Sequence, residues 1–260
     1  RVHAKEHLVE TKQQTKQYDR ILIATGARAF APPVKGLDPE DAFLMRTVED
    51  SIRFKERLKQ KNVRHAVVIG ASMAGIKVVE VLHKFGIETW LLDLASYIFP
   101  LAAYKEVAKE IEKRVEAQGV HLMFGVTIDH MEQENGEKTA VLTDGSRIPA
   151  DIVGLCIGTR AITETVQGEV EIGRGIVVDD HMRTSVPGIY AAGDCCEGNN
   201  LESGQNQIIG LWANANHQGE TAGINMAGGD MAYKGNILHN ITHFMNMDFI
   251  GFGDNRLTGE

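Results

Sequence analysis

One stretch of the chain constrains its fold more than any other: residues 67–93, VVIGASMAGIKVVEVLHKFGIETWLLD. An apolar run ends at Gly70, small residues follow, and an amphipathic segment leads to a second apolar run that closes on Asp93. This change from a strand pattern to a helical period and back is typical of a β-α-β unit. Because the crossover helix returns the chain beside its first strand, the unit implies a parallel sheet. The stretch therefore predicts an α/β fold.

The same alternation continues on both sides of this stretch. We expect helices at 47–59, with Thr47 as the N-cap, and at 74–85, 104–118 and 211–226. We expect buried strands at 21–24, 65–69, 87–92, 120–124, 151–157, 175–178 and 189–192, with hairpin turns at Asn135-Gly136 and Asp144-Gly145.

The turn from Gly70 to Gly75 nearly matches the pattern G-x-G-x-x-G. In that pattern the first glycine makes the turn, the second admits a pyrophosphate close to the backbone, and the third lets helix and strand pack closely. Ser72 stands at the middle position, where its hydroxyl can donate to a phosphate oxygen. Met73 and Ala74 then place backbone N–H groups at the positive end of the helix. The alternative is a tight strand-helix turn without a ligand.

Asp93 decides which nucleotide the turn would prefer. It closes the second strand, where an acid accepts hydrogen bonds from a ribose diol and repels a 2′-phosphate. No Arg or Lys lies in residues 94–100 to attract that phosphate. The pattern predicts nucleotide binding, with NAD(H) favoured over NADP(H).

Composition excludes several classes of function. The chain has 260 residues, 43% hydrophobic and 24% charged, with a net charge of −8 and no basic face for nucleic acid. It contains no apolar run of the roughly 20 residues that cross a bilayer, and no signal peptide. Three cysteines cannot form a disulfide framework, and His239 and His243 come nearest to a ligand pair without making one. We therefore expect a cytoplasmic protein without a metal, a nucleic-acid partner or a membrane partner.

Two further motifs, YDRILIATGARA at 18–29 and VPGIYAAGDCCEG at 186–198, flank the β-α-β unit. Together with Cys156-Ile157-Gly158 they occur in an ordered set. This set resembles the FAD- and NAD(P)H-dependent pyridine nucleotide-disulfide oxidoreductase superfamily, and most of all its branch of NADH oxidase, rubredoxin reductase and coenzyme A disulfide reductase. The segment LWANANHQGETAGINMAGG looks like the helix that follows the superfamily's Gly-Asp motif.

The resemblance implies an architecture. A Rossmann-like NAD-binding domain would be inserted between parts of an incomplete FAD-binding domain of the three-layer ββα type. The expected domains are a partial FAD-binding domain at 1–45, the NAD(H)-binding domain at 46–165, the remainder of the FAD-binding domain at 166–240 and the start of an interface domain at 241–260. The superfamily's N-terminal FAD-binding βαβ unit, with its own glycine fingerprint, is missing from this sequence.

The resemblance also assigns roles to residues. Thr25 and Gly26 would lie at the crossover between the FAD and NAD domains, Asp194 would hydrogen-bond the FAD ribityl chain, and Gly193 would let that chain approach. Gly158 would border the nicotinamide.

One residue departs from the superfamily pattern. Lys77 stands where many members carry a glutamate, so its ammonium would lie beside the flavin and favour the reduced, anionic form. The alternative is a solvated surface lysine.

The resulting functional hypothesis is an FAD-dependent NADH oxidoreductase. Hydride would pass from NADH to the flavin and on to a small-molecule or small redox-protein acceptor, in a chain that could form a homodimer. One alternative is an NAD(H)-binding module without flavin or turnover. Another is a structural or dimer-forming fragment whose glycine turn is empty.

Overall fold

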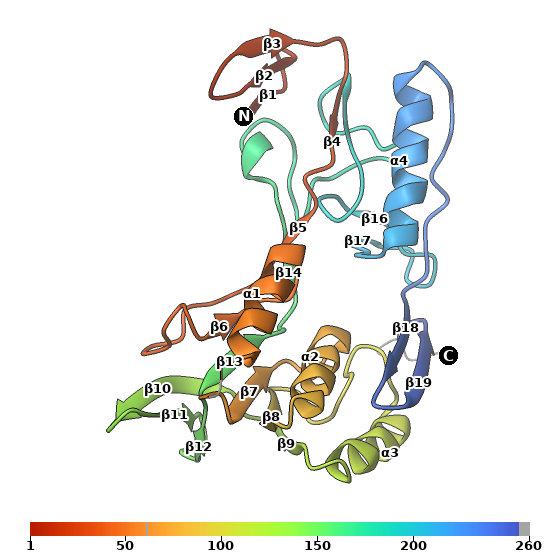
Figure 1. Cartoon of the computed structure of the whole chain (residues 1–260). Helices are drawn as coiled ribbons and strands as arrows, with labels where there is room; N and C mark the ends of the chain where they lie inside the picture. The colour runs from red at the N-terminus through yellow and green to blue at the C-terminus, as the bar shows by residue number, and fades with distance from the viewer. Residues whose placement is uncertain (61, 255–260) are drawn as a thin grey trace. The chain divides into compact units, whose positions relative to one another are not determined.

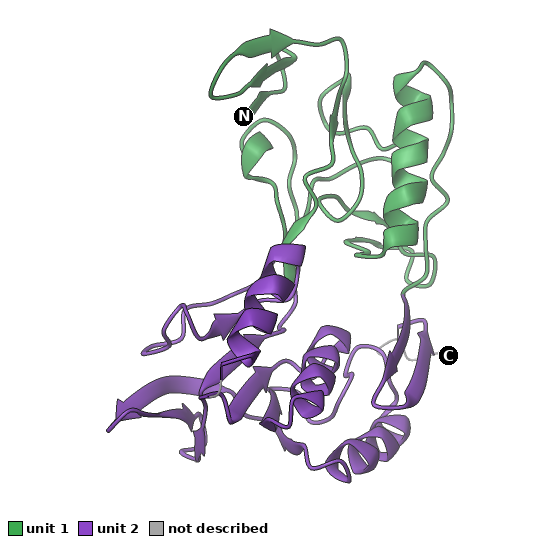
Figure 2. Ribbon diagram, in the orientation of Figure 1, with its two compact units in different colours: residues 1–28, 159–238 green, residues 29–158, 239–260 purple. Residues whose placement is uncertain are grey.

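The computed structural model describes residues 1–60 and 62–254, which fall into two compact units (Figure 2). Unit 1 contains residues 1–28 and 159–238, and unit 2 contains 29–158 together with the segment from 239 onward. Each unit therefore combines two stretches that are distant in sequence. The domain limits at residues 45, 165 and 240 remain a prediction.

A five-stranded parallel sheet forms the centre of unit 2, in the order β6-β13-β7-β8-β9 (Figure 1). Its strands are β6 (Ala42–Phe43), β7 (His65–Ile69), β8 (Glu88–Asp93), β9 (His121–Phe124) and β13 (Ile152–Leu155). The helices of this unit are α1 (Val48–Leu58), α2 (Met73–Lys84) and α3 (Lys105–Glu116). The parallel α/β fold expected from the sequence is confirmed.

Capping residues set the start of α1 and the end of α2. Thr47 and Asp50 form a capping box at α1, in which each side chain accepts a hydrogen bond from the other residue's backbone N–H. After α2, Gly86 adopts a φ of +69° and its N–H donates to the carbonyl of His83 at 2.9 Å. Glycine occupies this left-handed conformation at little cost, which ends the helix and starts β8.

Both faces of the parallel sheet are covered. On β7, Val68 packs in a core with Ile76 of α2, whereas its neighbour Val67 packs on the opposite face. That opposite face is closed by the antiparallel sheet of β10 (Ile128–Glu134), β11 (Glu137–Leu142) and β12 (Arg147–Pro149). The Asn135-Gly136 turn between β10 and β11 has positive φ at both residues, which confirms the expected hairpin.

A second hairpin completes the core on the α2 side. It consists of β18 (His239–Phe244) and β19 (Met247–Phe252), and it buries Phe244 and Phe249 against Phe99. This segment lies far from α2 in sequence but packs directly on it.

Unit 1 is built from short strands and one long helix. β1 (Val2–His3), β2 (Leu8–Glu10) and β3 (Thr15–Gln17) form an antiparallel sheet, and β4 (Ile21–Ile23) pairs in parallel with β15 (Ile189–Ala191). The remaining elements are β5 (Ala27–Ala29), whose last residue is assigned to unit 2, paired with β14 (Thr159–Ala161), β16 (Gly198–Asn199) paired with β17 (Asn206–Gln207), the 3₁₀ turn Glu164–Val166, and α4 (Trp212–Met226). None of the helices in residues 1–60 and 62–254 has the length and apolarity to cross a bilayer.

The strand expected at 175–178 was a wrong prediction. Ile176 makes only isolated bridges, to Ile172 and to Cys196, and no ladder follows. Its side chain is nonetheless fully buried, so the apolar run reflected burial in the unit 1 core and not strand pairing.

Helix α4 buries a polar stripe. Asn214, Gln218, Thr221 and Asn225, spaced three to four residues apart, are each at most 3% exposed. Gln218 Oε1 accepts the backbone N–H of Gly193 at 2.8 Å, which fixes the turn after β15. Asn214 and Asn225 donate to loop carbonyls, at Ile209 and at His181 and Met231, whereas Gln218 Nε2 has no hydrogen-bond partner among the described residues. Because buried amides are costly unless paired, these bonds tie α4 to specific loops.

We expect Gln218→Met to destabilise unit 1, because the Gly193 N–H would lose its acceptor. The free energy of unfolding should fall by about 1–3 kcal/mol, measured by urea denaturation. Glu220→Met, at an exposed position of the same helix, is the control. Equal losses in the two variants would show that the Gln218–Gly193 hydrogen bond contributes nothing specific.

Candidate functional site

The glycine turn follows the carboxyl end of β7, and two of its positions have no room for a side chain. A Cβ on Gly70 would lie 2.4 Å from the Cys156 carbonyl oxygen, and a Cβ on Gly75 would lie 1.9 Å from the Gly70 oxygen. Real side chains do not approach so closely, so both positions require glycine. Gly70 therefore packs closely against both Gly75 in α2 and Cys156 at the end of β13.

The amino end of α2 presents unpaired backbone donors. Ser72 is the N-cap, and its hydroxyl oxygen accepts the Gly75 N–H at 3.3 Å. Within the described residues, the backbone N–H groups of Ser72, Met73 and Ala74 have no hydrogen-bond acceptor. Three consecutive donors at the positive end of a 12-residue helix form a site that fits a pyrophosphate.

Asp93 is fixed beside this turn by two backbone hydrogen bonds. Its Oδ2 accepts the Ala71 N–H at 2.7 Å and its Oδ1 accepts the Ala95 N–H at 2.8 Å. Each carboxylate oxygen keeps a further lone pair, so the group can still accept from a diol. The structure thus places the expected acid at the edge where the donors of α2 begin.

Gly158 reaches the same edge from the neighbouring strand. It follows β13, which pairs with β7, and has a φ of +99°. The chain runs from β7 to β8 and β9 on one side, whereas β13 and β6 lie on the other side of β7, so the order of the strands reverses between β7 and β13. Ligands of open parallel sheets bind at such a switch point, outside the carboxyl ends of the strands. All the residues expected to bind NAD therefore gather at one edge of unit 2, and their individual roles remain predictions.

The two motifs assigned to FAD also meet, in unit 1. β4 and β15 are adjacent parallel strands, so Thr25-Gly26 and Gly193-Asp194 follow their carboxyl ends side by side. Thr25 Oγ1 donates to the Ile162 carbonyl at 2.6 Å, which holds the first turn. Gly26 has a φ of +70° and a Cβ there would meet no atom within 4 Å, so its backbone faces open space. Bare backbone at this edge fits the approach of an extended flavin chain.

Gln218 is a site residue that the sequence analysis did not identify. Its bond to the Gly193 N–H orients the turn that carries Asp194. The spacing of polar residues along 211–226 contained the signal, since a buried amide at a helical period implies a specific partner.

Lys77 is engaged within unit 2. Its Nζ donates to a carboxylate oxygen of Glu80 and, at 2.6 Å, to the His243 carbonyl of the β18–β19 hairpin. Burial would raise the pKa of Glu80, but hydrogen bonds from Lys77, Lys84 and the Met245 N–H outweigh it and lower that pKa to about 2. Lys77 therefore helps to fasten the hairpin to α2, and its expected place beside the flavin remains a prediction.

The three cysteines are free and buried. Burial raises the pKa of Cys156 to about 12, so it stays a thiol. Both remaining thiols donate to backbone carbonyls, Cys195 Sγ to Ile23 and Cys196 Sγ to Gly193, each at 3.4 Å, and the adjacent Cys195 together with burial raises the pKa of Cys196. At 0% and 1% exposure, Cys195 and Cys196 offer no surface to a substrate.

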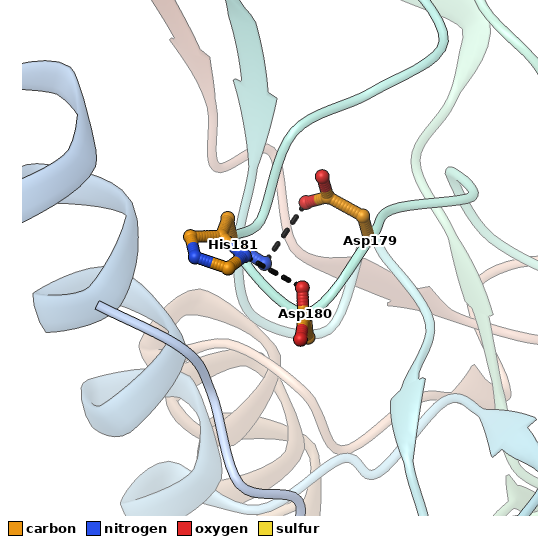
Figure 3. A group of neighbouring side chains, drawn as sticks. All are labelled: Asp179, Asp180 and His181. Atoms are coloured by element: carbon orange, nitrogen blue, oxygen red, sulfur yellow. Dashed lines mark hydrogen bonds and ion pairs between the residues drawn. The ribbon is translucent and has the colours of Figure 1, made fainter. Parts of the chain in front are cut away.

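A separate polar cluster lies in unit 1, where Asp179, Asp180 and His181 bring ligand atoms within 4.8 Å of one another (Figure 3). These groups satisfy one another without an ion. His181 Nδ1 lies 2.6 Å from Asp180 Oδ1, its Nε2 lies 2.9 Å from Asp230 Oδ1, and Asp179 Oδ1 accepts the His181 backbone N–H. The hydrogen bond to Asp180, aided by Asp230, raises the pKa of His181.

This arrangement predicts a pH dependence of stability. Because the folded pKa of His181 is raised above its unfolded value, its contribution is complete below about pH 6.5 and is lost as the pH rises through the folded pKa. Urea denaturation at a series of pH values should show that His181→Gln flattens this decline, whereas His217→Gln at an exposed position of α4 does not. Parallel curves for the His181 variant and the unmodified chain would contradict this assignment.

The chain is similar in sequence to several NADH oxidases. It is 29% identical to the NADH oxidase of Methanocaldococcus jannaschii, over 81% of this chain and 47% of the relative. It is 28% identical to that of Streptococcus pyogenes serotype M6 over 86% of this chain and 52% of the relative. The chain spans about half the length of these relatives.

Solved structures show the same fold. Reduced Bacillus anthracis CoADR-RHD superposes with a TM-score of 0.90 at 29% identity, covering 98% of this chain and 47% of the other. The water-forming NADH oxidase from Lactobacillus brevis, bound to NADH, has a TM-score of 0.87 at 26% identity, covering 93% and 53%. The family model described as pyridine nucleotide-disulphide oxidoreductase matches residues 1–219. With the paired strand-end sites described above, this match shows that the chain belongs to the pyridine nucleotide-disulphide oxidoreductase family.

Proposed function

We propose that this chain forms the NAD(H)-binding portion and part of the FAD-binding portion of an FAD-dependent NADH oxidoreductase. The observation that carries the proposal is the row of three unpaired N–H groups at Ser72, Met73 and Ala74, with Asp93 fastened beside them. Donors for a pyrophosphate and an acceptor for a ribose diol are thus held in one rigid turn. The NADH oxidases among the relatives support the same function.

Each part of unit 2 has a task in this proposal. The N–H groups of α2 hold the pyrophosphate, and Asp93 accepts hydrogen bonds from the adenosine ribose. The bare backbone at Gly158 leaves room for the nicotinamide beside β13.

Unit 1 would hold the flavin. Asp194 binds the ribityl chain, Gly26 and Gly193 allow its close approach, and Thr25 keeps the crossover turn in place. FAD, when bound, supplies the ring that takes a hydride from NADH and passes electrons to an acceptor. The protein's contribution is to bind and orient the two cofactors.

The acceptor in this proposal is a small molecule or a small redox protein. Relatives of both kinds occur, since one is an NADH oxidase of Enterococcus faecalis and another, 30% identical over 75% of this chain, is a nitric oxide reductase FlRd-NAD(+) reductase of Escherichia coli. A second candidate function is NAD(H) binding without flavin or turnover.

We expect the chain to bind NADH more tightly than NADPH, because Asp93 would face the 2′-phosphate. Asp93→Asn removes the charge and should narrow the ratio of dissociation constants by about tenfold, equivalent to about 1.4 kcal/mol. Nucleotide fluorescence titration measures both constants. Asp129→Asn, which removes a charge at an exposed position of β10, is the control. Equal affinity of the unmodified chain for both nucleotides would refute the role given to Asp93.

We expect the chain as it stands to retain FAD substoichiometrically after gel filtration. The residues Thr25, Gly26, Gly193 and Asp194 supply only part of the contacts that a dinucleotide of this size makes, and the superfamily's upstream fingerprint would supply the rest. Absorbance in the flavin bands, relative to protein absorbance, is the measurement. One tightly held FAD for each chain would contradict this expectation and exclude the binding-only candidate.

A further inference from the structure

The glycine turn is attached to its neighbours on two sides by different means. Toward β8, the backbone provides the bonds: the Gly70 N–H donates to the Leu92 carbonyl at 2.8 Å, and the Ala71 N–H donates to Asp93 Oδ2 at 2.7 Å. The backbone donors of these two residues are therefore used on the β8 side.

Toward β13, a side chain provides the bond. The ladder between β7 and β13 ends with Leu155 opposite Ile69, followed by the Cys156 N–H donating to the Ile69 carbonyl at 2.7 Å. The next group, the Cys156 carbonyl, accepts from the Ser72 hydroxyl at 3.0 Å. Within the described residues this is the carbonyl's hydrogen-bond partner, so Ser72 extends the attachment one step beyond the ladder.

The hydroxyl of Ser72 has a single proton, and that proton is committed. It points to Cys156, while the oxygen accepts the Gly75 N–H at 3.3 Å. One side chain thus bridges the turn, the first turn of α2 and the end of β13. A glycine at this position, as in the usual fingerprint, has no atom with which to make either bond.

We propose that Ser72 is a positioning residue that fastens the nucleotide-binding turn to β13 and so holds the unpaired N–H groups of Ser72, Met73 and Ala74, at the amino end of α2, in their binding arrangement. Its backbone N–H faces the pyrophosphate, whereas its hydroxyl faces the protein. The inference rests on the proposed function, because it concerns the same turn. It differs from the sequence expectation that the hydroxyl donates to a phosphate oxygen.

The two roles of the hydroxyl differ in the free chain. If the hydroxyl fastens the turn to Cys156, its loss loosens the end of the β7–β13 ladder before any ligand arrives and speeds exchange of the Cys156 amide hydrogen. If the hydroxyl serves only as a phosphate donor, that exchange is unchanged and the loss appears only in nucleotide affinity. The Cys156 amide is a suitable reporter, because it donates to the Ile69 carbonyl at 2.7 Å and is not itself bonded to Ser72.

Two variants separate these roles. Ser72→Ala keeps the Cβ but removes the hydroxyl, and Ser72→Thr keeps a hydroxyl that can cap the helix. For Ser72→Ala we expect about a fivefold faster exchange of the Cys156 amide and about a fivefold weaker affinity for NADH, as for the loss of one neutral hydrogen bond. For Ser72→Thr we expect both quantities within about twofold of the unmodified chain. Circular dichroism confirms that each variant is folded.

The outcomes are distinguishable. If Ser72→Ala weakens NADH binding but leaves Cys156 exchange unchanged, the hydroxyl contacts the phosphate and the proposal is wrong. If neither quantity changes, the bond to Cys156 does not position the turn, and the proposal is equally wrong. If the unmodified chain binds no NADH, the proposed function fails, while the exchange of the Cys156 amide still decides whether Ser72 fastens the turn.

Discussion

The close contacts of Gly70 with Cys156 at the end of β13, and of Gly75 with Gly70, are the constraint on which the nucleotide-binding unit depends. Neither position has room for a single methyl group, so α2 starts directly above the sheet and its first backbone donors point to the sheet edge. The position of Asp93, the bond from Ser72 to Cys156 and the approach of Gly158 all follow from this closeness. A looser turn would leave the same residues in the sequence without bringing them to one edge.

The parallel unit was predictable because its information is local. Residues 67–93 carry strand, turn, helix and strand in one continuous pattern, and Thr47 and Gly86 mark helix limits through their own backbone preferences. The prediction of a strand at 175–178 was wrong because strand pairing depends on information that is not local. Burial gives Ile176 the same apolar surroundings as a strand residue, but pairing depends on a partner that the sequence does not identify.

Long-range polar contacts were beyond sequence reasoning. Lys77 donates to the carbonyl of His243, and Gln218 accepts the backbone N–H of Gly193. In the sequence, Lys77 looks like a solvated lysine and Gln218 like an ordinary helix residue. Only the fold shows that one fastens a hairpin and the other orients the turn after β15. The ordered motifs gave the positions of Thr25, Gly26, Gly193 and Asp194, and the pairing of β4 with β15 supplied the reason that they belong together.

The division of each unit into two stretches has a consequence for biosynthesis. When a ribosome has produced residue 158, the sheet of unit 2 is complete, but the face that Phe244 and Phe249 will cover still exposes Phe99. Likewise β4 must wait for β15, made more than half the chain later, before it gains its parallel neighbour. Neither unit can finish folding from one uninterrupted segment as it emerges. The nascent chain must therefore carry two unfinished cores at once, a period in which exposed apolar surface invites chaperone binding or aggregation.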